Sequence, residues 1–391
     1  MKRVALAVVL GMLLASCQAS SRSKHALVVV SAPLTAHPWV GQFLERGARL
    51  AAAGSNLAVE VRDNEGSAQR AVAIARDAVN EGAVALIIDG VGARAVAEVT
   101  DPAHLAVFIA FEGGASLVDP KRAPTLFRMA PANTYLCRRL ADYLAATRPD
   151  KRMAVLSDDS AYGREGAAAT RADLLHDELT VVSDQSVPAE AREVSVQVLA
   201  ARRSGAMTLV VWARAAVVAA VLRAARGNHW QVPVYAGPSA EDPLVRQQLA
   251  DHPDWVDGLT FVSFRITSEV GPAPFAAYRA RYEKAYGADR IGVIATGREV
   301  VMPPDWSTYA FDSVALVAAA VDQAGAATPR AVYDALQRVS ITGANGDERG
   351  FGPDDREGVS PDDIYLAHFA GMRFVPNTDD PLSVNLPAVP Q

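Results

Sequence analysis

The feature that most constrains this chain is a repeated alternation of short apolar runs with longer segments of helical periodicity. In the first part of the chain the apolar runs are His25–Ser31, Leu57–Arg62, Val84–Ile88 and Val107–Phe111. Continuous apolar runs of this length are typical of strands buried on both faces. Because segments with helical periodicity separate them, the pattern predicts βαβ units and a parallel sheet.

The alternation starts again at Met153 and continues to Val262, which predicts a second sheet. Half of the 391 residues are apolar, so the chain can bury a large core. We therefore expect an α/β fold of two similar lobes. Two stretches are expected to lie outside regular elements, the long loop Glu112–Pro131 and the irregular segment Gly287–Pro304.

One tyrosine is predicted to lie where a strand of the second lobe ends. The apolar run Met153–Leu156 is followed by a polar turn, and Tyr162 then opens a segment with helical periodicity. Ligands of open α/β sheets bind at the carboxyl ends of the strands. Tyr162 is thus a candidate ligand contact, and a purely structural turn tyrosine is the alternative.

Charge and motifs exclude several classes of function. The net charge is −6 and both signs are scattered, so no basic stripe is available for nucleic acid. No G-x-S-x-G or H-E-x-x-H motif occurs, and the seven histidines are dispersed. We therefore expect neither an enzyme nor a metal site. Trp306, Tyr309 and Phe311 open a long predicted helix and are interpreted as core residues.

A glycine-rich turn after the third predicted strand needs a separate interpretation. The segment Asp89–Ala95 precedes a helix, and Glu112 ends the next strand, which is the spacing of a dinucleotide fingerprint. The N-terminal signal described next places the chain outside the cytoplasm, where a free nicotinamide cofactor is not expected. We therefore predict no cofactor and interpret Gly92 as allowing a helix N-terminus to approach a ligand.

The N-terminus has the pattern of an export signal. Lys2 and Arg3 precede the apolar run Val4–Leu14, which is too short to span a bilayer as a helix. The small residues before Cys17 resemble the lipobox of bacterial lipoproteins, in which this cysteine is acylated and becomes the first residue. Residues 1–16 are then a signal peptide and residues 17–24 a tether. An ordinary secretory signal is the alternative.

Several phrases of the sequence together resemble the type I periplasmic binding proteins, and within them the branched-chain amino acid and amide branch that serves ABC importers. The resemblance runs from about His25 to Phe374, and its phrases are SAPLTAHPWVGQFLERGARLA, VEVRDNEGSAQRAVAIARDAVNEGAVALI, LFRMAPAN, MAVLSDDSAYGREG, PVYAGPS and YAFDSVALVAAAVDQAG. It implies two Rossmann-like lobes joined by three chain crossings and a hinge that closes over a ligand. The first lobe is expected at 25–132 plus 265–340, and the second at 133–264 plus 341–391.

The resemblance also implies a set of ligand contacts between the lobes. The family's serine, threonine and glutamate that hold a zwitterion fall here at Ala93, Gly113 and Ser239, so branched-chain amino acid specificity is not expected. Two aromatic contacts remain, Trp39 and Tyr162. Charged residues that the family pattern does not contain are Arg94, Arg214, Glu112 and Glu241.

The expected ligand is therefore a small polar or amphipathic molecule. Its apolar part should touch the two aromatic residues, and its polar end should meet the backbone at Gly92 and at Gly113-Gly114. The arginines would neutralise an anionic group and the glutamates a cationic one. We expect a monomeric, membrane-anchored lipoprotein, periplasmic or on the cell surface, that serves an ABC permease of the cytoplasmic membrane. A lipoprotein sensor, or a regulator of a membrane or cell-wall partner, is the alternative.

Overall fold

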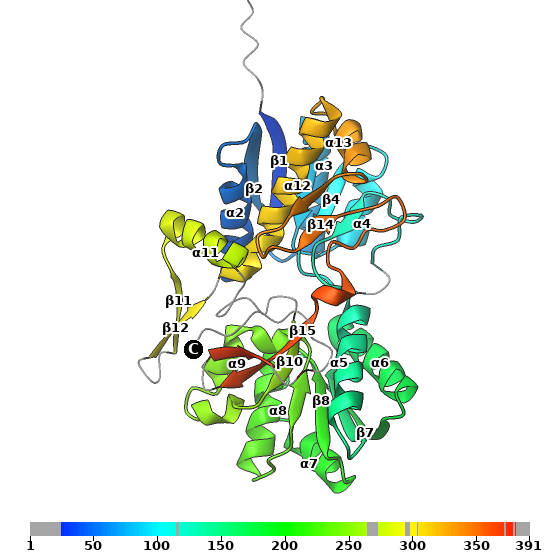
Figure 1. Ribbon diagram of the computed structural model, residues 1–391, viewed down its shortest axis with the longest axis vertical. Helices are drawn as coiled ribbons and strands as arrows, with labels where there is room; N and C mark the ends of the chain where they lie inside the picture. The colour runs from blue at the N-terminus through cyan, green and yellow to red at the C-terminus, as the bar shows by residue number, and fades with distance from the viewer. Residues whose placement is uncertain are drawn as a thin grey trace, which may run out of the picture.

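The computed structural model describes residues 25–114, 117–263, 273–293, 298–302, 304–370, 373–377 and 380. Two α/β lobes lie one above the other along the long axis of the molecule (Figure 1). Each lobe has its own central sheet with helices packed on both faces. The expected two-lobe α/β fold is confirmed.

The first lobe is built on a five-stranded parallel sheet with the strand order β2-β1-β3-β4-β5. Its strands are β1 (Ala26–Ala32), β2 (Leu57–Asp63), β3 (Ala85–Ile88), β4 (Ala106–Ile109) and β5 (Leu126–Arg128). All residues of β3 and β4 are buried, as expected for apolar runs covered on both faces. The carboxyl ends of these strands face the second lobe (Figure 1).

Helices cover both faces of this sheet. One face carries α2 (Pro38–Ala52), α12 (Thr308–Ala324) and α13 (Pro329–Leu336), and the other carries α3 (Ala68–Glu81) and α4 (Ala93–Thr100). Local signals define α3 well, because the Ser67 hydroxyl accepts a hydrogen bond from the Arg70 amide at 3.3 Å and Gly82 ends the helix in the left-handed conformation.

The second lobe has a seven-stranded sheet with the order β16-β15-β10-β9-β8-β6-β7. The strands are β6 (Arg152–Asp158), β7 (Thr180–Val187), β8 (Thr208–Trp212), β9 (Val234–Ala236), β10 (Thr260–Ser263), β15 (Tyr365–Ala370) and β16 (Arg373–Pro376). The strands β6 to β10 are parallel, whereas β15 pairs antiparallel with both of its neighbours. The strands β15 and β16, near the end of the chain, thus complete the sheet that β6 to β10 form.

Helices also cover both faces of the second sheet. One face carries α5 (Asn133–Thr147) and α6 (Ala161–His176), and the other carries α7 (Ser195–Arg203), α8 (Ala215–Gly227) and α9 (Pro243–Gln248). Close packing of α6 on β8 depends on Gly166, because a Cβ there would lie 1.6 Å from Nε1 of the buried Trp212.

The chain passes between the lobes three times. The first crossing joins β5 to α5, and the second lies between β10 and α11 (Ala273–Tyr286), which packs on α2 of the first lobe. Phe351 and Val359 belong to the core of the first lobe, and the Arg128 amide donates to the Arg356 carbonyl at 2.8 Å. The third crossing therefore follows residue 359, and the boundary that we expected at 341 is corrected accordingly.

Several short elements were not expected. β5 lies within the predicted loop Glu112–Pro131, and the hairpin of β11 (Asp289–Val293) and β12 (Arg298–Met302) lies within the segment predicted to be irregular. A second hairpin joins β13 (Ser340–Thr342) to β14 (Glu348–Gly350). These strands are three to five residues long, too short to leave a periodic pattern.

No single helix in the described part of the chain is long and apolar enough to cross a membrane. One bent pair, Pro304–Ala324 with Pro329–Leu336, has the required length and composition, with an angle of 104° between its parts. Cys17 and the predicted signal peptide and tether lie outside the described residues.

Candidate functional site

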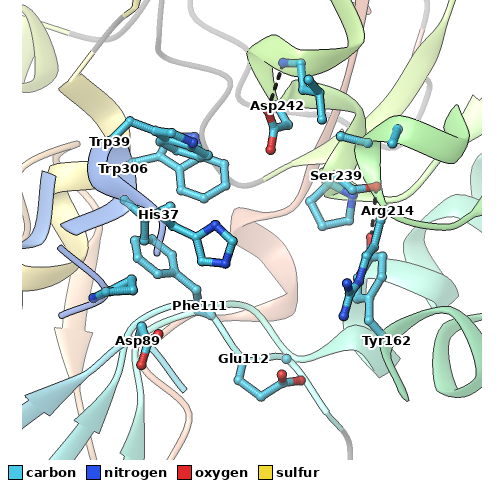
Figure 2. A pocket seen from close by; sticks show the side chains of 18 of the residues that line it. His37, Trp39, Asp89, Phe111, Glu112, Tyr162, Arg214, Ser239, Asp242 and Trp306 are labelled. Atoms are coloured by element: carbon cyan, nitrogen blue, oxygen red, sulfur yellow. Dashed lines mark hydrogen bonds between the residues drawn. The ribbon is translucent and has the colours of Figure 1, made fainter. Parts of the chain in front are cut away.

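A cleft of about 660 Å³ lies between the two lobes. The first lobe lines it with residues that follow β1, β3 and β4, and the second lobe with residues at or beyond the carboxyl ends of β6, β8, β9 and β10. Figure 2 shows side chains from both lobes pointing into the same space. The cleft thus occupies the position at which parallel α/β sheets bind ligands.

Four aromatic rings form the first-lobe wall of the cleft, and we call them the aromatic wall: Trp39, Phe111, Trp306 and Tyr309. The ring centroids of Trp39 and Trp306 are 4.9 Å apart, and Phe111 lies 5.1 Å from both Trp306 and Tyr309. Edge-to-face and tilted contacts at these distances fix the rings against one another. The wall offers a rigid apolar surface to a ligand.

Trp39 enters the wall from the first turn of α2. His37 precedes this helix, and Pro38 occupies its first position, where a missing amide hydrogen costs nothing. Trp306 comes from the short 3₁₀ helix Pro304–Ser307, which packs against α2. Two segments far apart in the sequence therefore build one surface.

The second lobe contributes Tyr162, which stands at the start of α6 on the opposite side of the cleft (Figure 2). Its hydroxyl donates to the Ser239 hydroxyl at 3.4 Å, and Ser239 in turn donates to the Ala213 carbonyl. The ring lies 5.8 Å from that of Trp212. Burial raises the pKa of Tyr162 far above its usual range, so the phenol stays neutral.

Two carboxylates of the first lobe lie in neighbouring loops where β3 and β4 end. Gly90, which has a φ of +131°, brings its backbone against the next loop, because a Cβ there would lie 2.5 Å from the Cβ of Glu112. Asp89 is 8% exposed and accepts from Asn64 Nδ2 at 3.1 Å and from the Val91 amide at 3.2 Å. Burial raises the pKa of both Asp89 and Glu112.

The second lobe adds charges of both signs. Arg214 occupies the N-cap position of α8 without a capping hydrogen bond from its side chain. It forms an ion pair with Glu190 at 3.2 Å, and both side chains are largely exposed at the cleft. Asp242 caps α9 by accepting from the Leu244 amide at 2.8 Å. Burial raises the pKa of Asp242, and the charges of Arg246 and of His37 across the cleft oppose that effect.

The floor of the cleft is held by hydrogen bonds between the first crossing and the loop after β4. The backbone amide of Asn133 donates to the Gly113 carbonyl at 2.8 Å, and Arg128 Nη1 donates to the Gly114 carbonyl at 2.6 Å. Asn133 is 4% exposed, and its Nδ2 has no acceptor among the described residues. A buried amide donor at a cleft is satisfied when a ligand supplies an acceptor.

The structure brings six of the predicted site residues to the cleft: Trp39, Glu112, Gly113, Tyr162, Arg214 and Ser239. Five do not line it: Gly92, Ala93, Arg94, Gly114 and Glu241. A Cβ at Gly92 would lie 2.8 Å from the Cβ of Ala68, so this glycine serves the packing of α4 on α3. Arg94 is exposed on α4, and Ala93 and Glu241 are buried.

Residues that the sequence interpretation assigned elsewhere also line the cleft. Trp306 and Tyr309 were expected in the core, yet both line it, and only Phe311 is confined to packing, against Tyr278. His37, Asp89 and Asn133 were not proposed as ligand contacts. Asp89 directly follows a predicted strand, which is the one signal that could have identified it.

The described residues contain no group of three or more His, Cys, Asp or Glu placed to hold a metal ion. The cleft itself combines an aromatic surface with a few convergent polar groups, as binding sites for small organic molecules do.

Known proteins resemble this chain over most of its length. The sequence pattern of the periplasmic binding protein family matches residues 38–370. A type 1 periplasmic binding protein from Bordetella pertussis Tohama I aligns with a TM-score of 0.77 and 19% identity, over 90% of this chain and 100% of that one. None of the curated proteins matches the sequence.

Two further solved structures contain ligands. A branched-chain amino acid transporter substrate-binding protein from Streptococcus pneumoniae, in complex with isoleucine, has a TM-score of 0.73 and 18% identity over 90% of this chain and 98% of its own. A solute-binding protein of an ABC transporter from Rhodopseudomonas palustris BisB5, in complex with 3,4-dihydroxybenzoic acid, has a TM-score of 0.72 and 16% identity, covering 91% and 98%. The TM-scores show that these proteins share the fold of this chain.

Proposed function

Because the chain belongs to the periplasmic binding protein family, we propose that it captures a small molecule between its lobes outside the cytoplasm and delivers it to an ABC importer. The observation that carries this proposal is the interlobe cleft, which the aromatic wall lines from one side and Tyr162 from the other. A ligand that contacts both lobes favours the closed form over the open one, since its affinity then differs between them.

The ligand that suits this cleft is amphipathic and is not a plain branched-chain amino acid. The aromatic wall offers far more flat apolar surface than an aliphatic side chain needs, and the lining carboxylates Asp89, Glu112 and Asp242 leave little provision for a ligand carboxylate. Related structures hold either isoleucine or an aromatic acid, so this fold accommodates both kinds of ligand.

Substitution of Tyr162 tests the proposed capture. The probe is the compound that raises the melting temperature most in a library of amino acids, aromatic acids and aromatic amines. Tyr162→Ala should weaken its binding at least about tenfold in calorimetry, because a buried ring contact is lost, and should reduce the closure seen by small-angle scattering. Tyr162→Phe keeps the ring and should bind nearly as the parent does.

If Tyr162→Ala binds the probe as tightly as the parent, the cleft is not the binding site. The alternative hypothesis, a lipoprotein that senses or regulates a membrane or cell-wall partner, is then the better explanation.

We further propose that Cys17 carries lipid, which would keep the protein at a membrane near its permease. Cys17→Ser should move the protein from the membrane fraction to the soluble exported fraction, because the acyl chains supply the attachment. The measurement is fractionation of cells followed by immunoblotting. A Cys17→Ser protein that stays with the membranes would contradict the lipid anchor, and Cys137→Ser, at a buried helix position, is the matched control.

A further inference from the structure

We propose that the cleft selects an organic cation with a flat apolar body, whose amine is held by Asp89 and Glu112 of the first lobe. This inference rests on the proposed function, since it names the ligand class of the same cleft. It follows from the balance of charges in the lining, from the placement of two carboxylates in neighbouring loops of the first lobe, and from the surfaces that surround them.

Negative charge predominates among the described residues that line the cleft. Four of them are carboxylates, namely Asp89, Glu112, Glu190 and Asp242, and one is an arginine. That arginine, Arg214, forms an ion pair with Glu190 at 3.2 Å. Three carboxylates then share the lining with one further basic side chain, His37, and the charge of Arg246, outside the lining, also acts on Asp242. A cationic ligand would balance this excess.

Asp89 is the more buried of the two carboxylates of the first lobe, and neither of its hydrogen-bond donors is charged. The donors are an asparagine amide and a backbone amide, at 3.1 and 3.2 Å. Burial raises the pKa of Asp89, which reflects the cost of ionising it there. An ammonium group would remove that cost, because an ion pair with hydrogen bonds stabilises a desolvated carboxylate.

Glu112 adds a second carboxylate from the neighbouring loop, and among the described residues it accepts one hydrogen bond, from the Gly114 backbone amide at 3.1 Å. The guanidinium of Arg128, whose charge opposes the rise in the pKa of Glu112, is bound in a bidentate manner by Glu357 and also donates to the Gly114 carbonyl. In the described part of the chain, neither Asp89 nor Glu112 forms an ion pair with a basic side chain. Both remain available to a ligand amine.

A third carboxylate reaches this edge of the cleft from the opposite lobe. A Cβ at Gly114 would lie 3.0 Å from Oε2 of Glu165, on α6, and 3.3 Å from Oε1 of Glu112. The charge of Glu165 adds to burial in raising the pKa of Glu112. Like charges that approach across two lobes oppose closure, and a cation bound beside Glu112 offsets that repulsion.

The other residues that line the cleft favour a ligand with an apolar body and one hydrogen-bond acceptor. The aromatic wall stands beside the two carboxylates, with Phe111 next to Glu112 in sequence and Trp306 against Phe111 (Figure 2). Aromatic faces attract cations as well as apolar rings. Asn133, whose buried Nδ2 has no acceptor among the described side chains and backbone, would donate to a hydroxyl or carbonyl of the ligand.

Two probes of similar shape and opposite charge test this inference. 2-Phenylethylamine and 3-phenylpropionate carry the same ring, and calorimetry at pH 7.5 with the full chain compares them directly. We expect the amine to bind at least about tenfold more tightly than the acid. Asp89→Asn and Glu112→Gln should each weaken amine binding at least about tenfold, because each removes a charge-assisted hydrogen bond.

The matched control is Glu98→Gln, which removes an exposed carboxylate from α4 of the same lobe and should leave amine binding unchanged. Tighter binding of 3-phenylpropionate would overturn the inference and leave the proposed capture intact. Equal amine binding by the parent, Asp89→Asn and Glu112→Gln would also overturn it. Binding of neither probe would overturn it too, and the proposed capture would fail only if the Tyr162 test failed as well.

Discussion

Replacement of Glu357 by glutamine should lower the free energy of unfolding by about 3 kcal/mol or more. Arg128 is 1% exposed, and its Nε donates to Glu357 Oε2 at 2.7 Å while a second nitrogen donates to Oε1. Without the carboxylate, a buried guanidinium loses its only charge partner among the described residues. Removing one member of a buried ion pair is far more costly than removing a surface charge. Urea denaturation measures the change.

Glu348→Gln is the control for this substitution, because Glu348 is exposed on β14 and its loss should change stability by no more than about 0.5 kcal/mol. Arg128 also holds the Gly114 carbonyl, so the Glu357 variant should loosen the loop that carries Glu112 and Gly113. Equal stability of the two variants would show that the ion pair contributes nothing to the first lobe.

Gly47→Ala should destabilise the protein by about 2–3 kcal/mol. Gly47 lies on α2, and a Cβ at this position would be 2.0 Å from the carbonyl oxygen of Ser307. Backbone cannot move aside as a flexible side chain can, so α2 and the 3₁₀ helix Pro304–Ser307 must separate. Because Ser307 follows Trp306, the contact between Trp39 and Trp306 should weaken together with ligand binding.

Gly227→Ala provides the comparison, since Gly227 is also helical and a Cβ there would meet only the Trp255 ring at 3.8 Å. This change should be neutral or stabilising by up to about 1 kcal/mol. Thermal unfolding of both variants measures the difference. A Gly47→Ala protein as stable as Gly227→Ala would contradict the close packing of α2 against the wall of the cleft.

The strands and helices that carry strong periodicity could be predicted from the sequence. The buried strands β1, β3 and β8 are apolar runs, and α3 has both a capping serine and a terminal glycine. The strands β13 and β14 pair with each other in a hairpin and are three residues long, too short for a periodic pattern. The short strand β5 pairs with β4, and its Arg128 also forms a bridge with Glu357, which is distant in the sequence. No local pattern carries that information.

The candidate site was predicted only in part, for a related reason. The rule about strand ends selected Tyr162. Trp39 was expected from the resemblance to the family, and Glu112 as a charge near a strand end that the family pattern does not contain. Trp306 lies more than 260 residues from Trp39 and reaches the cleft because its 3₁₀ helix packs on α2. Whether an aromatic residue at a helix start faces the core or a cleft depends on that packing.

Gly92 shows the opposite error, in which a motif was assigned to the wrong purpose. Its φ of +70° and its close approach to Ala68 explain the glycine by helix packing alone. Asp89, in the same motif, is the residue that reaches the cleft. The spacing of a motif does not say which of its members meets the ligand.

We propose that the chain holds a small molecule between the aromatic wall and Tyr162. Native mass spectrometry tests it most directly, with the full chain incubated with pooled amino acids, aromatic acids and aromatic amines and compared with the double variant Tyr162→Ala/Trp306→Ala. We predict at least one adduct of one ligand per parent chain, absent from the double variant. No adduct with the parent, or the same adducts with both proteins, would contradict the account.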